Sequence, residues 1–331
     1  MLPPVAVIGA GSWGTALALQ FARKGRNVRL WGRDRDELQR IAAARENRKY
    51  LPGIAFPDNL CVEADLGKSL SGVADILIAV PSHGLRETLQ QVKPLLGKNA
   101  RICWATKGFE VATGKLPHQV AAEVLGDNLP MAVLSGPTFA KEVGAGLPTA
   151  MTVAANDDTF ASDLASSLSG EKFRAYTSSD MIGVEVGGAV KNVLAIGAGI
   201  SDGLGFGANT RIALISRGLV EMTRLGLALG AKQDTFMGLA GMGDLVLTCT
   251  DNLSRNRRMG LALASGKTID EAQEEIQQVV EGVLAAKAVH AVAERLHVEM
   301  PICQQIYRVL YEGAPPRESV AALMSRSLKP E

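Results

Sequence analysis

The feature that most constrains this chain is the sequence GAGSWG at residues 9–14, which follows the apolar run VAVI and precedes a helical pattern from about Ser12. This strand–turn–helix order is the arrangement that cradles the pyrophosphate of a dinucleotide. Gly9 permits the tight turn, Gly11 lets the backbone approach the phosphates, and Gly14 lets the helix pack close to the sheet. The chain contains 35 glycines, so a purely structural turn is the alternative, but the position after a strand favours dinucleotide binding.

The end of the next predicted strand bears on which dinucleotide is bound. An acidic residue here holds the ribose 2′-hydroxyl of NAD, whereas an arginine suits the 2′-phosphate of NADP. Arg33 directly follows Gly32, and Asp34 lies at a similar distance, but Asp34 and Glu37 together match a helix capping box. The sequence therefore favours NADP(H), with NAD(H) still usable.

The first half of the chain alternates apolar runs with amphipathic stretches, which predicts a parallel sheet with helices on both faces. We expect strands at 5–8, 28–31, 76–80, 102–105, 132–134, 148–155 and 173–176, and helices at 15–24, 85–92 and 157–168. From residue 180 onward helical patterns dominate, and only 246–248 has the propensity of a strand, which leaves its structure open. The fold class is α/β: a Rossmann-type dinucleotide-binding domain at 1–179, followed by an all-α, substrate-binding domain at 180–331.

Composition argues against several classes of function. Lysine and arginine number 35 against 34 acidic residues, so we expect neither a general nucleic-acid binder nor a protein that sits on anionic membranes. No uncharged apolar run approaches the ~20 residues of a membrane helix, and the start lacks the basic region of a signal peptide. The four cysteines lie far apart, which predicts reduced thiols in the cytoplasm, with no metal site. A homodimer is compatible with the sequence, which does not determine the oligomeric state.

Polar turns follow the predicted strands, among them PSHG, TKGFE and SGPTFAKE. In an open parallel sheet, ligands bind beyond the carboxyl ends of the strands, so these turns predict one rim of a cofactor and substrate site. Lys107 could reach an anionic ligand there; the alternative is a solvated surface lysine. His83 could be the acid/base of a generic dehydrogenase, but Pro81 and Gly84 beside it favour a plain turn.

In the helical half, Lys191 interrupts an otherwise small and apolar helix, GGAVKNVLAIG. A buried lysine needs a partner or a task, and partial desolvation suits a lysine for proton transfer near neutral pH. Gly187, one helical turn earlier, would leave room for a ligand, and Asn192 could hydrogen-bond a substrate hydroxyl. The alternative is a lysine that snorkels at a domain surface. We expect Lys191 to be the catalytic acid/base.

A second group of polar residues lies in GMGDLVLTCTDNLSRNRRMG. Asp244, in a glycine-rich turn, could steady the charge of Lys191. Ser254 is the expected N-cap of a helix. Its hydroxyl and the helix N–H groups, with Arg255 and Asn256, would bind a phosphate or another anion. A basic, solvated helix start is the alternative.

The neighbouring Arg257 and Arg258 are expected to face water or a nearby segment. A nicotinamide, a lysine that carries a proton and a cluster that binds an anion imply reduction of a carbonyl, or oxidation of an alcohol, on a small anionic substrate. One alternative is a ketopantoate or 3-hydroxyisobutyrate type reductase, which needs no such anion cluster. Another is a redox-sensing protein that binds NAD(P) without turnover and needs no lysine beside a carboxylate.

Taken together, the motifs GAGSWGTALA, WATKGFE, SGPTFAKEV, GGAVKNVLAIGAGISDGLGFGANTR, GLAGMGDLVLTCT and SRNRRMG resemble the bacterial NAD(P)-dependent glycerol-3-phosphate dehydrogenases, over nearly the whole chain. The resemblance implies interconversion of dihydroxyacetone phosphate and sn-glycerol 3-phosphate with NAD(P)H, for glycerophospholipid synthesis. It implies that Lys191 accepts the proton in alcohol oxidation and donates it in the reverse direction. The implied substrate contacts are Lys107, Gly136, Thr138, Lys191, Asp244, Ser254, Arg255 and Asn256. The implied cofactor contacts are Ser12, Trp13, Arg33, Lys107, Ala140, Arg255, Val279 and Glu281.

Overall fold

A computed structural model of the chain describes residues 3–325 and divides into two compact units. Of the described residues, the first unit contains 3–107 and Pro117–Val184, and the second contains Gly108–Leu116 and 185–325. Residues 1–2 and 326–331 of the two expected domains lie outside the described residues. The short segment Gly108–Leu116 belongs with the second unit, which the sequence did not indicate. The division of function after residue 179 stays a prediction.

The first unit is built on one eight-stranded sheet with the strand order β3-β2-β1-β4-β5-β6-β7-β8. Its strands are β1 (Val5–Ile8), β2 (Val28–Trp31), β3 (Leu60–Val62), β4 (Asp75–Ile78), β5 (Arg101–Trp104), β6 (Met131–Ser135), β7 (Thr149–Ala155) and β8 (Phe173–Ser178). Its helices are α1 (Ser12–Arg23), α2 (Arg35–Ala44), α3 (Leu66–Leu70), α4 (Leu85–Val92), α5 (Pro117–Leu125), α6 (Ala140–Ala145) and α7 (Asp158–Leu168).

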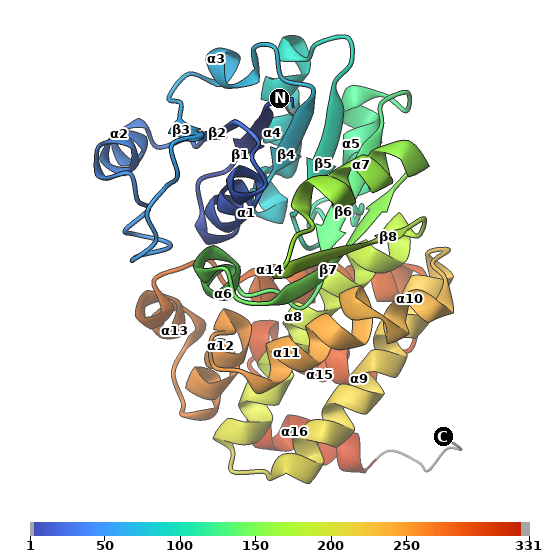
Figure 1. The fold of residues 1–331 in the computed structure, drawn as a ribbon. Coiled ribbons are helices and arrows are strands. Elements are labelled where there is room, and N and C mark those ends of the chain that lie inside the picture. The colour runs from blue at the N-terminus through green and yellow to red at the C-terminus, as the bar shows by residue number, and fades with distance from the viewer. Residues whose placement is uncertain (1–2, 326–331) are drawn as a thin grey trace. The chain divides into compact units, whose positions relative to one another are not determined.

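Helices cover both faces of this sheet, α1 and α7 on the front and α4 and α5 behind it (Figure 1). Because both faces are covered, the inner strands are mostly apolar, and all four residues of β1 are buried. The predicted Rossmann-type architecture is confirmed, and β1, β2 and α4 begin and end at the predicted residues.

The sheet departs from the prediction at two places. β7 runs antiparallel to β6, with Ala132 opposite Ala155 and Ser135 opposite Thr152. The connection between them holds only the short α6, and a parallel return would need a crossover to the other end of the sheet. The strand β3 was not predicted, because three residues of which only Leu60 is buried leave no readable period.

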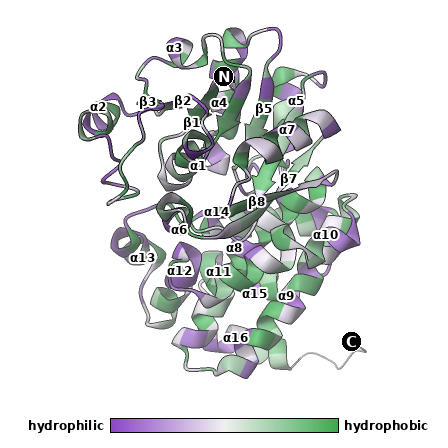
Figure 2. Cartoon of the chain, in the orientation of Figure 1, coloured by the Kyte–Doolittle hydropathy of each residue, from purple (hydrophilic) through white to green (hydrophobic). Residues whose placement is uncertain are grey.

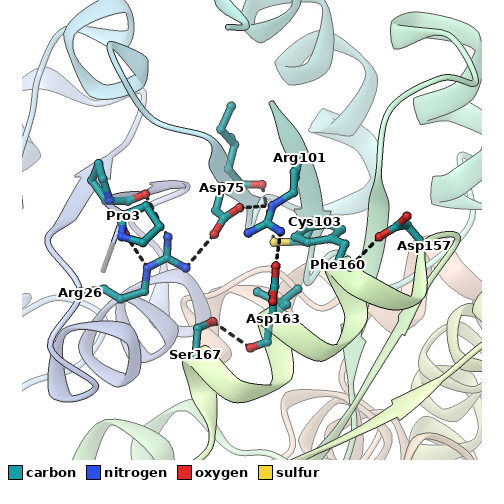
Figure 3. A network of polar contacts seen from close by, with 12 residues as sticks. Pro3, Arg26, Asp75, Arg101, Cys103, Asp157, Phe160, Asp163 and Ser167 are labelled. Carbon is teal, nitrogen blue, oxygen red and sulfur yellow. Dashed lines mark hydrogen bonds and ion pairs between the residues drawn. The ribbon is translucent and has the colours of Figure 1, made fainter. Parts of the chain in front are cut away.

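A buried ion network joins the amino ends of the central strands (Figure 3). Asp75, the first residue of β4, accepts from Arg26 at 2.7 Å and from Arg101 at 2.6 Å. Arg101 also pairs with Asp163 of α7 at 2.6 Å and lies over the ring of Phe160. These contacts link the amino ends of the strands, whereas ligands of open α/β sheets bind at the opposite, carboxyl end.

The described part of the second unit is helical from Glu185 to Ser325. Its helices are α8 (Met181–Gly203, which begins in the first unit), α9 (Ala208–Ala228), α10 (Gln233–Met237), α11 (Asp244–Thr250), α12 (Arg255–Ala264), α13 (Ile269–Ile276), α14 (Glu281–Arg295), α15 (Pro301–Tyr311) and α16 (Pro316–Met324). The open segment 246–248 is helical and lies within α11, where Val246 is exposed and Thr248 is buried. Figure 2 shows the contrast between the hydrophobic α11 (green) and the hydrophilic, exposed α13 (purple).

α8 is the central helix of the second unit. Among the described residues it is the one helix long and apolar enough to cross a membrane, but 89% of its most apolar window is buried inside the protein, as in a core helix. Its glycines admit neighbouring elements: a Cβ at Gly197 would lie 2.7 Å from the side chain of Ile306, and one at Gly199 would overlap the carbonyl oxygen of Arg257. Gly230 follows the end of α9 with a φ of 96°, a conformation that favours glycine and ends the helix.

Candidate functional site

The glycine-rich turn joins β1 to α1 as predicted. Gly9 has a φ of 126°, which favours glycine, and a Cβ there would overlap the carbonyl oxygen of Ala79 at the end of β4. A Cβ at Gly14 would overlap the carbonyl oxygen of Gly9. Two of the three motif glycines are therefore required by the close packing of α1 on the sheet.

Gly11 differs from the other two glycines. Its φ of −77° is accessible to any residue, and a Cβ built there meets no atom within 4 Å. It is the N-cap of the 12-residue α1, where no side chain caps the helix and no acidic residue stands in the first turn. Open space in front of uncapped N–H groups fits an anionic group such as a pyrophosphate.

Ser12 and Trp13 form the first turn of α1. Within the described chain, the Trp13 indole N–H is buried without a hydrogen-bond partner. Trp13 and Ala140, the first residue of α6, are both partly buried and pack against the core of the first unit.

After the end of β2, the side chain of Arg33 is exposed, and the carboxylate of Asp34 bonds to the backbone. The Asp34 carboxylate accepts from the N–H of Glu37 at 3.0 Å and so caps α2, as predicted. No hydrogen bond or ion pair involves the Arg33 guanidinium among residues 3–325, so its charge is available to an incoming anion.

Three of the expected residues meet at the carboxyl ends of β5 and β6. The ammonium of Lys107 and the hydroxyl of Thr138 both donate to the carbonyl oxygen of Gly136, at 3.5 and 3.1 Å. Lys107 is half-buried, which excludes the fully solvated alternative. His83 lies in the exposed turn Ser82–Gly84, in keeping with the preferred turn interpretation.

In the second unit, Lys191 is buried, with 7% of its surface exposed, and has partners. Its ammonium donates to a carboxylate oxygen of Asp244 and, at 3.0 Å, to the hydroxyl of Thr248. The Thr248 hydroxyl in turn donates to the Asp244 carbonyl oxygen at 2.6 Å. The predicted pairing of Lys191 with Asp244 is confirmed, and the snorkelling alternative is wrong.

Two details around this pair differ from the prediction. The space beside Gly187 holds no ligand, because a Cβ there would overlap the carbonyl oxygen of Ala240. Asp244 is not in a turn: it is the first residue of α11 and follows the single π-helical turn Leu239–Gly243. That turn crosses α8 so closely that only glycine fits at position 187, and it delivers Asp244 to Lys191.

Sequence reasoning missed Thr248. The available signal was its position four residues after Asp244 in an apolar segment, which places both side chains on one helical face. The propensity of residues 246–248 is also compatible with a strand, and in a strand Asp244 and Thr248 would not lie one helical turn apart.

The start of α12 carries the expected anion-binding residues. Ser254 is the N-cap, and its hydroxyl oxygen accepts from the N–H of Arg257 at 3.2 Å, as predicted. Arg255 is half-buried, and in the part of the chain that the structure describes its guanidinium has no hydrogen bond or ion pair. Asn256 is buried between Asn192 and Gly282, at 2.9 Å from each.

Arg257 does not face water. It is buried, pairs with Asp202 at the end of α8, donates to the carbonyl oxygen of Cys249 at 3.2 Å and bonds Asn252. The expected neighbouring segments are therefore its partners, and it fixes the turn that precedes Ser254. Of the two predicted surroundings of Arg257, water is wrong and a nearby segment is confirmed, because the loop 251–254 folds back over its guanidinium.

Val279 and Glu281, expected at the cofactor, flank the start of α14. Val279 is 46% exposed, and Glu281 is the first residue of the helix. Among residues 3–325 no group of three or more His, Cys, Asp or Glu side chains could hold a metal ion. The four cysteines are free thiols, and burial raises the pKa of Cys249 to about 12.

Comparisons with known proteins match this architecture along both units. The model of the NAD-dependent glycerol-3-phosphate dehydrogenase N-terminus matches residues 4–161, and that of the C-terminus matches residues 180–321. Glycerol-3-phosphate dehydrogenases (NAD(P)+) of Idiomarina loihiensis and Shewanella frigidimarina are 56% and 58% identical, each over 99% of this chain and over 99% and 97% of their own length. The crystal structure of glycerol-3-phosphate dehydrogenase from Coxiella burnetii is 51% identical with a TM-score of 0.95, covering 98% of this chain and 99% of that one. This chain therefore belongs to the NAD-dependent glycerol-3-phosphate dehydrogenase family.

Proposed function

We propose that this chain is an NAD(P)-dependent sn-glycerol-3-phosphate dehydrogenase, which interconverts dihydroxyacetone phosphate and sn-glycerol 3-phosphate for glycerophospholipid synthesis. The observation that carries the proposal is the buried Lys191–Asp244–Thr248 cluster in a chain that belongs to this family. A redox-sensing protein without turnover has no use for a desolvated lysine held this way.

Lys191 would carry the proton of the reaction. In the reducing direction its ammonium gives a proton to the oxygen that becomes the alcohol, and in oxidation its amine takes that proton back. Asp244 stabilises the charged form, and Thr248 fixes the direction of the Nζ atom. The bound nicotinamide supplies or accepts the hydride.

The phosphate of the substrate would be held at the start of α12. Arg255 brings a charge that has no protein partner among the described residues, and Ser254 and Asn256 stand on either side of it. An arginine at a helix N-terminus binds a phosphate through charge-assisted hydrogen bonds. Lys107, Gly136 and Thr138 would contribute the contacts of the first unit.

The dinucleotide would be bound through the turn between β1 and α1. Gly9 and Gly14 set the geometry of that turn, and the open side of Gly11 receives the pyrophosphate. The exposed Arg33 favours the 2′-phosphate of NADP(H), while NAD(H) remains usable. The further cofactor contacts are Ser12, Trp13, Lys107, Ala140, Arg255, Val279 and Glu281.

We assign the nucleotide mainly to residues 1–179 and the chemistry of the substrate mainly to residues 180–331. The four free cysteines support a reducing, cytoplasmic location. A homodimer stays a prediction, and light scattering of the purified protein measures it.

One assay tests the proposal directly. The purified protein is mixed with dihydroxyacetone phosphate and either NADPH or NADH, and oxidation of the cofactor is followed by the fall in the absorbance of the reduced nicotinamide. Ketopantoate is the control substrate. Turnover of the phosphate substrate alone is the expected result. Turnover of ketopantoate instead would assign the chain to the rival reductase class, and no turnover with either cofactor would reject the proposal.

A further inference from the structure

The helix α14 begins without a cap of its own. Its N-cap is Val280, whose side chain has no hydrogen-bonding atom, so the N–H groups of the first turn need an acceptor from elsewhere. Asn256 supplies one: its Oδ1 accepts from the N–H of Gly282, the second residue of the helix, at 2.9 Å. A residue of α12 thus caps α14, 26 positions further along the chain.

The orientation of the Asn256 amide is fixed from both sides. A backbone N–H can only donate, so the atom that faces Gly282 must be the oxygen. The Nδ2 of Asn256 then donates to Oδ1 of Asn192 at 2.9 Å, and Asn192 donates to the carbonyl oxygen of Gly188 at 3.3 Å. Both asparagines are buried, with 8% and 4% of their surface exposed, so water does not compete for these bonds.

Gly282 lies directly on α8. A Cβ at this position would be 2.6 Å from the carbonyl oxygen of Asn192, 2.7 Å from Oδ1 of Asn256 and 2.9 Å from the side chain of Ile196. No other residue could bring α14 this close. The start of α14 is therefore seated on the turn of α8 that follows Lys191.

We propose that Asn256 is a positioning residue for the segment 279–281, and through it for binding of the dinucleotide, besides any contact with the substrate. The inference rests on the proposed function, which places Val279 and Glu281 at the cofactor. Without the Asn256 acceptor, the N–H of Gly282 would be buried and unpaired. In such a variant the segment 279–281 loses its contact with α8, and the enzyme without substrate binds NAD(P)H more weakly than the wild type does.

The test is a fluorescence titration of the free enzyme with NADPH and NADH. Asn256→Ala should weaken binding about tenfold, equivalent to about 1.4 kcal/mol, and Gly282→Ala should act in the same direction. The matched control is Thr268→Ala, which removes the side-chain cap of the neighbouring α13 and should leave the affinity within about twofold. Wild-type affinity in a folded Asn256→Ala variant would overturn the inference.

Amide hydrogen exchange measures the Gly282 hydrogen bond directly, first in the wild-type chain. The N–H of Gly282 should exchange slowly, as a buried bonded amide does, and Asn256→Ala, which removes the acceptor oxygen, should lose that protection. Rapid exchange of Gly282 in the wild type would overturn the inference. Failure of the wild type to bind either dinucleotide would instead reject the proposed function, while the exchange result still decides whether Asn256 holds the segment.

Discussion

Lys191 and Asp244 lie 53 positions apart in the sequence and form an ion pair whose side chains are 9% and 1% exposed. Each charge would be costly to bury alone, and together they satisfy one another. An apolar helix can carry a lysine at its centre only because the π-helical turn before α11 brings the carboxylate to it. The pair is therefore a structural requirement as well as a candidate for chemistry, and experiments must separate the two.

Replacing Lys191 tests its role in proton transfer. Lys191→Met should lower kcat by about 10²–10⁴-fold, the range for loss of a general acid/base, and it leaves Asp244 buried without its partner. The double variant Lys191→Met/Asp244→Asn removes the unpaired charge and should recover stability in urea denaturation but not turnover. Recovery of turnover in the double variant would exclude Lys191 as the proton carrier.

Thr248 should matter through its hydroxyl alone. Thr248→Val keeps the shape of the side chain but removes the 3.0 Å bond to Lys191. Hydrogen bonds to charged groups contribute about 1.5–3 kcal/mol, so kcat should fall by roughly tenfold or more. Thr248→Ser keeps the hydroxyl and should stay near the wild-type rate. If the valine and serine variants have equal kcat values, the hydroxyl has no part in holding Lys191.

The open side of Gly11 predicts an effect on binding without an effect on folding. Gly11→Ala meets no protein atom within 4 Å, so its free energy of unfolding should change by less than ~1 kcal/mol. Affinity for NADPH should fall about tenfold, because the added methyl enters the space of the pyrophosphate. Gly97→Ala, also without a neighbour within 4 Å, is the control and should change neither quantity. Unchanged affinity in Gly11→Ala would place the pyrophosphate elsewhere.

Arg33 should set the preference between the two dinucleotides. Arg33→Ala should lower kcat/KM with NADPH about tenfold, through loss of a charge-assisted bond to the 2′-phosphate, and leave NADH within about twofold. Arg35→Ala, two residues further on and also exposed, is the control for net charge. An equal loss with both cofactors would show that Arg33 does not read the 2′-phosphate.

Glu221 predicts how the second unit responds to pH. It is buried in α9 and accepts from the backbone N–H groups of Ile302 and Cys303, and burial raises its pKa to about 7. A carboxyl whose pKa is raised on folding binds its proton more tightly in the native state. Its contribution is fully present below the unfolded pKa near 4.5 and is lost as the pH rises through about 7.

The measurement compares wild type with Glu221→Gln in urea denaturation from pH 5 to pH 8. The stability of the variant relative to wild type should increase with pH, by an amount on the order of 2 kcal/mol. A difference that is constant across this range would mean that Glu221 does not titrate there.

Much of this fold can be predicted from local patterns. The turn at Gly9 and the pairing of Lys191 with a carboxylate follow from the glycine spacing and from the cost of a charge in an apolar helix. The role of Ser254 as an N-cap follows in the same way. The antiparallel β7 was not predictable, because strand direction depends on where a connection returns and apolar alternation is the same in both directions.

The misjudged details share one cause. From the local sequence alone, Gly187 indicates space for a ligand and Arg257 indicates a surface charge. Only the segment that packs against each residue shows otherwise. Ala240, which fills the space beside Gly187, lies 53 positions away in the sequence, and Asp202, which pairs with Arg257, lies 55 positions away. Thr248 was missed for the same reason, since its role depends on the contact with Lys191, which is distant in the sequence.

The glycines of α8 have a consequence for the order in which the second unit folds. Each glycine in a helix costs about 1 kcal/mol relative to alanine, and Gly187, Gly197, Gly199 and Gly203 all lie where other elements press against α8. A peptide of this sequence alone should not be helical in water. During synthesis α8 leaves the ribosome long before the residues that fill those positions, between Ala240 and Ile306. The packing of α8 is therefore complete only after α15 has been made.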